Sequence, residues 1–320
     1  MRSVGQQGIV GNSTQPSHSK DRFNIVSQEW VSRPERSNVW TIRFIVWFAL
    51  TFGRRATRIL LYPISFYFVI FSVKARAASR KYLDRALGRR STLMDGFRHC
   101  FYFASTILDR VFLLNNQISL FDVRAHGEEI FKEIKANGRG CLLIGAHLGS
   151  FEVIHALSRD HGHPRTSLVM YEENARKLNA VLNSINPQHD RPVIPLGKID
   201  SMLKIQEALK RGEYIGILAD RTISGKKMIA CDFLGGQIHL PITPFRLAVI
   251  LNCPVVLMLG IYRGGNRYDV DFEYLADSRQ LAQSDRDLAI KQIAQRFASR
   301  LEHYCREAPY NWFNFYDVWK

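Results

Sequence analysis

Residues 141–152 read CLLIGAHLGSFE, and this stretch joins a strand signal, a loop and the start of a helix. The apolar run Cys141–Ile144 is bounded by glycines, which is typical of a short buried strand. The next residues, FEVIHAL, have the apolar spacing of an amphipathic helix with Ser150 as its N-cap. We therefore expect His147 in the loop that connects the carboxyl end of a strand to a helix.

Glu152 follows His147 by five residues. On one helix, five steps of roughly 100° would leave the two side chains about 140° apart and unable to meet. With His147 in the loop and Glu152 in the first helical turn, the carboxylate can bond to Nδ1 of the imidazole. Nε2 is then free to take a proton from a substrate hydroxyl. The alternative is a loop histidine beside a helix-capping glutamate, and the spacing alone does not decide between the two.

From residue 127 onward, helix and strand signals alternate along the chain. Helices are expected at 97–114, 128–136, 151–159, 173–183, 199–211, 245–251 and 285–306, and strands at 141–144, 167–170, 193–195, 214–219, 255–260 and 268–274. Strands separated by helices usually form a mostly parallel sheet with its sites at the carboxyl ends of the strands. The predicted fold class is α/β, a mostly parallel central sheet flanked by helices, with an N-terminal membrane-associated helical segment.

A second set of polar residues follows another apolar run. Asp220, Arg221 and Thr222 come directly after the strand predicted at 214–219. An arginine at this place can hold a phosphate or the oxyanion of a tetrahedral intermediate. A turn without a catalytic role explains the same pattern. Further on, the glycines near 235 and the prolines at 241 and 244 either line an apolar groove or mark plain turns.

Positive charge is concentrated near the N-terminus. The formal net charge is +15, and residues 33–90 hold 13 Lys and Arg against Glu35 and Asp84, which accounts for +11. Within 38–81, aromatic-rich apolar runs alternate with these basic residues, as in an interfacial membrane anchor. The uncharged run 59–73 is shorter than the roughly 20 residues of a membrane span. A monotopic hairpin or an interfacial helix pair is expected here, and a buried core hairpin with a basic rim is the alternative.

Other classes of protein lack their signatures in this chain. There is no G-x-S-x-G nucleophile elbow, no dinucleotide or phosphate-loop fingerprint and no nucleic-acid-binding motif. The five cysteines are widely spaced and have the appearance of reduced core residues, and no metal site is predicted. We expect a disordered tail at 1–28, a basic, aromatic-rich helical segment at 29–90 and an α/β domain at 91–320.

The motif His147-Leu-Gly-Ser-Phe-Glu152 resembles the hallmark of the lysophospholipid acyltransferase superfamily, a histidine followed after four residues by Asp or Glu. The form found here looks like the branch of bacterial late lipid A acyltransferases. Asp220-Arg221-Thr222, Cys253-Pro-Val-Val256 and the aromatic C-terminus extend this likeness over residues 28–320. The C-terminus, with Trp30 and Glu35-Arg36, is most similar to the predicted acyltransferases of aryl-polyene and related lipid gene clusters.

The resemblance implies a Gram-negative inner-membrane enzyme, attached to the cytoplasmic face through residues 38–81. It would move a fatty acyl chain from an acyl carrier protein or coenzyme A thioester to a lipid hydroxyl or amine, without a cofactor. His147 matches the family's general base and Glu152 its partner. The expected substrate-binding residues are Gly145, Gly149, Asn174, Asp220, Arg221 and Thr222. The expected partners are the thioester donor, a membrane lipid acceptor and an anionic membrane surface, not nucleic acid.

Two features set this chain apart from its relatives. Asp220 is followed by Arg221 where lipid A acyltransferases commonly have glutamine, and the phosphate-gripping arginine block of glycerolipid acyltransferases is not evident near 170–174. The acyl acceptor therefore stays open. The competing functions are an acyl thioesterase that uses His147 to activate water, and a non-enzymatic module that binds membrane surfaces.

Overall fold

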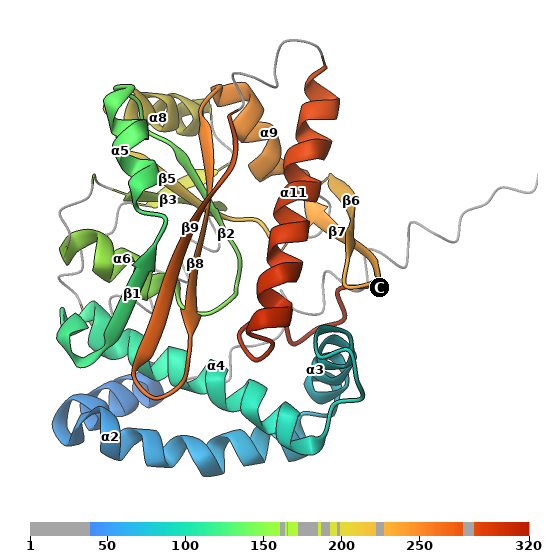
Figure 1. Cartoon of the computed structure of the whole chain (residues 1–320). Coiled ribbons are helices and arrows are strands. Elements are labelled where there is room, and N and C mark those ends of the chain that lie inside the picture. The colour runs from blue at the N-terminus through green and yellow to red at the C-terminus, as the bar shows by residue number, and fades with distance from the viewer. Residues whose placement is uncertain are drawn as a thin grey trace, which may run out of the picture.

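The computed structural model describes residues 39–160, 164, 166–171, 185–186, 193–196, 199–221, 227–277 and 285–319 (Figure 1). The predicted tail at 1–28 and the predicted helix at 173–183 lie outside these residues.

A seven-stranded sheet forms the centre of the molecule, in the order β1-β9-β8-β2-β5-β3-β4. Its strands are β1 (Asp122–His126), β2 (Leu142–Gly145), β3 (Thr166–Tyr171), β4 (Val193–Leu196), β5 (Tyr214–Leu218), β8 (Pro254–Tyr262) and β9 (Arg267–Asp277). Every neighbouring pair is parallel except β8 and β9, which form an antiparallel hairpin. The sequence-based prediction of a mostly parallel sheet is confirmed.

Helices cover both faces of this sheet. Alternate residues along β2 belong to different cores: Leu142 and Ile144 to one, Leu143 and the preceding Cys141 to the other. The first core includes side chains of α8 (Ile199–Lys210), α9 (Ile242–Leu251) and α11 (Arg286–Glu307). The second includes side chains of α4 (Leu93–Leu114), α5 (Glu129–Ala136) and α6 (Phe151–Asp160). Because both faces are covered, all four residues of β2 are buried.

Three strands were absent from the sequence-based prediction. β1 is an edge strand that pairs with β9, and its residues alternate between exposed and half-buried, so it carries no long apolar run. β6 (Met228–Phe233) and β7 (Gly236–Pro241) form a separate antiparallel hairpin. The glycine-rich stretch near 235 is the turn of this hairpin, where Leu234 and Gly235 both adopt positive φ.

The N-terminal helices lie at one end of the molecule (Figure 1). α2 (Val39–Phe71) has a break at Gly53, whose φ is 78°, and α3 (Val73–Ala86) turns away from α2 by 95°. α2 is held against α4 by a buried ion pair, in which Arg54 Nε lies 2.7 Å from Asp109 Oδ1. Tyr268 of β9 donates a hydrogen bond of 2.7 Å to the same carboxylate, so α2 is joined to the sheet as well.

Only a narrow stripe of the second half of α2 is buried. Thr57, Leu61, Ser65 and Val69 recur every four residues and face the protein. Large apolar side chains occupy the rest of this surface, each at least 40 % exposed: Ile59, Leu60, Tyr62, Ile64, Phe66, Tyr67, Phe68, Ile70 and Phe71. We call these nine residues the α2 apolar face. Within the described residues, no single helix has the length and apolarity to cross a membrane, whereas the bent pair Ile45–Phe71 and Val73–Ala86 passes that test together.

Candidate active site

His147 and Asp220 meet at the carboxyl ends of two neighbouring strands. The parallel register pairs Gly145 of β2 with Leu218 of β5, and each polar residue follows its strand by two positions. Asp220 Oδ1 lies 2.8 Å from Nδ1 of His147. A carboxylate can only accept, so Nδ1 carries the hydrogen and Nε2 of the neutral imidazole keeps its lone pair.

Four hydrogen bonds hold the Asp220 carboxylate. Besides Nδ1 of His147, its donors are the His147 backbone N–H, the indole Nε1 of Trp312 and the amide Nδ2 of Asn314, and each of these three lies 3.0 Å from Oδ2. Burial alone raises the pKa of Asp220, but the charge and hydrogen bonds of His147 and the charge of Arg221 outweigh that effect. The pKa of Asp220 therefore lies well below its ordinary value, and the group stays ionised.

The His147 loop is clamped by the end of the chain. We call residues 309–319 the C-terminal strap. The N–H of Phe313 donates to the His147 carbonyl at 2.9 Å, and the N–H of Gly149 donates to the Asn311 carbonyl at 2.9 Å. Gly149 has a φ of +72°, and a Cβ at this position would collide with the carbonyl of Gly260. The glycine is needed because the chain turns tightly here against β8.

Glu152 lies elsewhere than expected. Its Oε1 forms an ion pair of 2.9 Å with Nε of Arg110 on α4, and only 5 % of the Glu152 side chain is exposed. The expectation that Glu152 accepts the Nδ1 hydrogen of His147 is wrong, because Asp220 holds that position. The first turn of α6 packs toward α4, where a buried carboxylate needs a cation, while the imidazole faces the neighbouring strand end.

The His147 side chain is partly exposed. The side chain is 31 % exposed, and Nε2 has no hydrogen-bond partner among the residues that the structure describes. Burial lowers the pKa of His147 first, and the positive charge of Arg221 lowers it further, whereas Asp220 acts in the opposite direction. The net effect is a pKa below the ordinary value, so the imidazole is an unprotonated base at neutral pH.

Arg221 supports the strap. Its Nε donates to Asn314 Oδ1 at 2.6 Å, and its Nη2 donates to the Phe313 carbonyl at 2.6 Å. These two nitrogens are thus committed to the protein. Backbone N–H groups of the same loop are committed as well, because those of His147, Gly149 and Ser150 donate to Asp220, Asn311 and Gly260.

The remaining predicted site residues divide into two groups. Gly145 is the last residue of β2, where a Cβ would approach the Met258 carbonyl at 3.1 Å, so close packing of the sheet requires a small residue there. Asn174 and Thr222 lie outside the described residues. Sequence reasoning missed Arg110, Trp312 and Asn314, although the position of Asp220 at a second strand end was a usable signal for its partnership with His147.

This arrangement supplies a carboxylate, an oriented imidazole and an open nitrogen. An imidazole held in this way can take a proton from an incoming hydroxyl or amine. The reaction needs no nucleophile from the enzyme when the substrate provides one. Within the part of the chain that the structure describes, no three His, Cys, Asp or Glu residues gather in a way that could hold a metal ion.

The profile of one protein family matches residues 28–320 of this chain, and its description is bacterial lipid A biosynthesis acyltransferase. No curated protein matches the chain.

Proposed function

Since the chain belongs to the bacterial lipid A biosynthesis acyltransferase family and is therefore an acyltransferase, we propose that it moves a fatty acyl chain from a thioester to a lipid hydroxyl or amine, with His147 as general base. The observation that supports this role is the hydrogen bond of 2.8 Å between Nδ1 of His147 and Asp220, which leaves Nε2 open. The donor would be an acyl carrier protein or coenzyme A thioester.

The reaction proceeds by direct attack. Nε2 of His147 takes the proton of the acceptor, whose oxygen or nitrogen attacks the thioester carbonyl. The tetrahedral intermediate then collapses, the carbon–sulfur bond breaks, and the imidazolium returns its proton to the leaving thiolate. No acyl-enzyme forms, because the nucleophile belongs to the substrate.

Asp220 takes the role that the sequence motif suggested for Glu152. The carboxylate holds the imidazole in the tautomer with a bare Nε2 and stabilises the imidazolium that forms during transfer. Glu152 acts indirectly: its ion pair of 2.9 Å with Arg110 holds that arginine beside the site. The cation of Arg110 also lowers the pKa of His147, after the larger effects of burial and Arg221.

A transfer assay tests this function. Purified protein is incubated with a radiolabelled acyl carrier protein thioester or acyl coenzyme A, together with a bacterial lipid extract. We expect labelled lipid from the wild-type chain and none above background from His147→Ala, which should retain the wild-type circular dichroism spectrum. Lipid labelling by that variant at the wild-type rate would remove the general-base role. Release of free fatty acid without labelled lipid would instead support a thioesterase. The absence of any turnover would support a module that binds membrane surfaces.

We also propose that α2 lies in the interface of the inner membrane on its cytoplasmic side. This proposal is supported by the α2 apolar face, an extent of exposed apolar surface that typically marks contact with lipid or protein. Exposed basic side chains of α2 and α3, among them Arg55 and Arg80, can approach anionic headgroups. A lipid acceptor would then approach the enzyme along the bilayer.

A further inference from the structure

The C-terminal strap contacts the proposed base through Asp220. Trp312 and Asn314 supply two of the three hydrogen bonds to Oδ2 of Asp220, each 3.0 Å long. Both side chains are almost fully buried, with 1 % of each residue exposed. Among the hydrogen bonds of the described residues, both side chains bond Asp220 and neither bonds His147 directly. Their effect on the imidazole therefore passes through the Asp220 carboxylate.

We infer that Asn314 and Trp312 are positioning residues, which hold the Asp220 carboxylate in the rotamer that accepts the Nδ1 hydrogen of His147. This inference rests on the proposed base role of His147. Trp312 and Asn314 are thus working parts of the active site, although they lie at the far end of the chain from the His147 motif.

The orientation of the Asn314 amide is determined from both sides. Its Oδ1 accepts from Nε of Arg221 at 2.6 Å, so its NH₂ group must face Asp220. Asn314 therefore forms a bridge between the half-buried Arg221 cation and the buried Asp220 carboxylate. A flipped amide would bring two oxygens together at Asp220 and two donors together at Arg221.

Trp312 is fixed by packing and by a second histidine. Its ring contacts Tyr82 and Phe233, with centroid distances of 5.1 Å and 5.0 Å. Its backbone carbonyl lies 2.9 Å from Nε2 of His99, a buried residue of α4. The indole N–H is therefore presented to Asp220 by rigid neighbours, as a positioning group requires.

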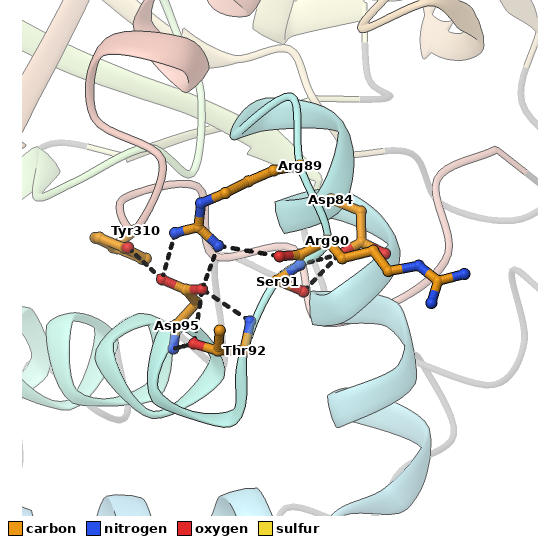
Figure 2. Close-up of polar contacts among 7 residues, drawn as sticks. All are labelled: Asp84, Arg89, Arg90, Ser91, Thr92, Asp95 and Tyr310. Atoms are coloured by element: carbon orange, nitrogen blue, oxygen red, sulfur yellow. Dashed lines mark hydrogen bonds and ion pairs between the residues drawn. The ribbon is translucent and has the colours of Figure 1, made fainter.

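The strap is anchored on both sides of this contact. Figure 2 shows the anchor before it, where the Tyr310 hydroxyl donates to Asp95 at 2.7 Å and Arg89 bonds the same carboxylate. Asp95 also completes the capping box at the start of α4 with Thr92. The anchor after it is the ion pair of 2.8 Å between Lys81 and Asp317. Neither anchor includes Asp220, which makes the second one a matched control.

The first test compares Asn314→Ala and Trp312→Phe with wild type in the transfer assay. We expect kcat to fall about 10- to 100-fold with KM within about twofold, because a displacement of about 1 Å can cost roughly 100-fold in rate. Asp317→Asn loosens the strap without touching Asp220, and its kcat should stay within about twofold of wild type.

The second test measures the tautomer of the His147 imidazole directly. In ¹⁵N spectra of labelled protein, with the signal assigned by comparison with His147→Gln, wild type should show the Nδ1–H tautomer alone. Asn314→Ala should show a mixture of tautomers. Asn314→Asp should move the acid limb of the kcat/KM profile to higher pH, because an added carboxylate favours the imidazolium.

Two results would overturn the inference. One is wild-type kcat in both strap variants. The other is a loss of activity that matches a loss of folded protein while the tautomer and pH profile stay unchanged. Failure of the proposed function is a different outcome: His147→Ala would retain transfer while the tautomer of His147 still responded to Asn314→Ala.

Discussion

At the scale of single residues, the site depends on which carboxylate reaches the imidazole. Asp220 is completely buried yet ionised, because four donors surround it. Glu152 is nearly as buried, but its charge is balanced by Arg110. The two carboxylates therefore have different tasks, although Glu152 is only five positions along the chain from His147 and Asp220 is 73 positions from it.

Asp220→Asn should lower kcat by about 10³- to 10⁴-fold, since an amide donor beside Nδ1 favours the tautomer with hydrogen on Nε2, which cannot accept a proton. Glu152→Gln should lower kcat less and the melting temperature more, because it leaves Arg110 without its anion. Steady-state kinetics and thermal unfolding of both variants measure this contrast. A larger kcat loss for Glu152→Gln than for Asp220→Asn would contradict the assignment.

At the scale of elements, α3, α4 and the C-terminal strap meet at His99. Ser79 of α3 bonds its Nδ1 at 2.7 Å, and the Trp312 carbonyl accepts from its Nε2 at 2.9 Å. Burial lowers the pKa of His99 to about 4, against the opposing effect of the hydrogen bond to Trp312. The imidazole is therefore neutral in the folded protein at neutral pH, and it joins three elements without carrying charge.

This pKa predicts a pH-dependent stability. Because the folded pKa of His99 is depressed, its contribution is fully present above the unfolded value of about 6.5 and is lost as pH falls toward about 4. The free energy of unfolding should drop by roughly 1.4 kcal/mol per pH unit in that window from this residue. His99→Gln, which cannot titrate, should show a shallower decline in urea unfolding between pH 7 and pH 5. An unchanged decline would mean that His99 is not the responsible group.

At the scale of the whole molecule, the distribution of apolar surface is uneven. The sheet is covered on both faces, whereas the α2 apolar face is left exposed at one end of the protein. α2 is nevertheless firmly attached, because Arg54 pairs with Asp109 in a place where only 11 % of the arginine side chain and none of the aspartate is exposed. A helix that is fixed to the core but apolar outside suits attachment to a bilayer.

We expect the purified chain to co-float with vesicles that contain phosphatidylglycerol. Replacement of Phe66, Phe68 and Phe71 by serine should weaken this binding by about 100-fold or more, at about 1 kcal/mol for each partly buried ring. Replacement of Leu203 and Leu288 is the control, because these leucines are 54 % and 49 % exposed but lie on α8 and α11. Equal losses in both variants would refute contact through α2.

The sequence by itself determined the alternation of strands and helices, the loop position of His147 and the strand-end position of Asp220, because these follow from apolar periodicity and local turn chemistry. Only the tertiary structure decided that β2 lies beside β5 in a register that brings His147 to Asp220, and that Glu152 faces Arg110. It also brought Trp312 and Asn314 to Oδ2 of Asp220. The reason is physical: periodicity reports which face of an element is buried, whereas the partner of a buried charge is set by the order of strands and the path of the chain end, which no local pattern encodes.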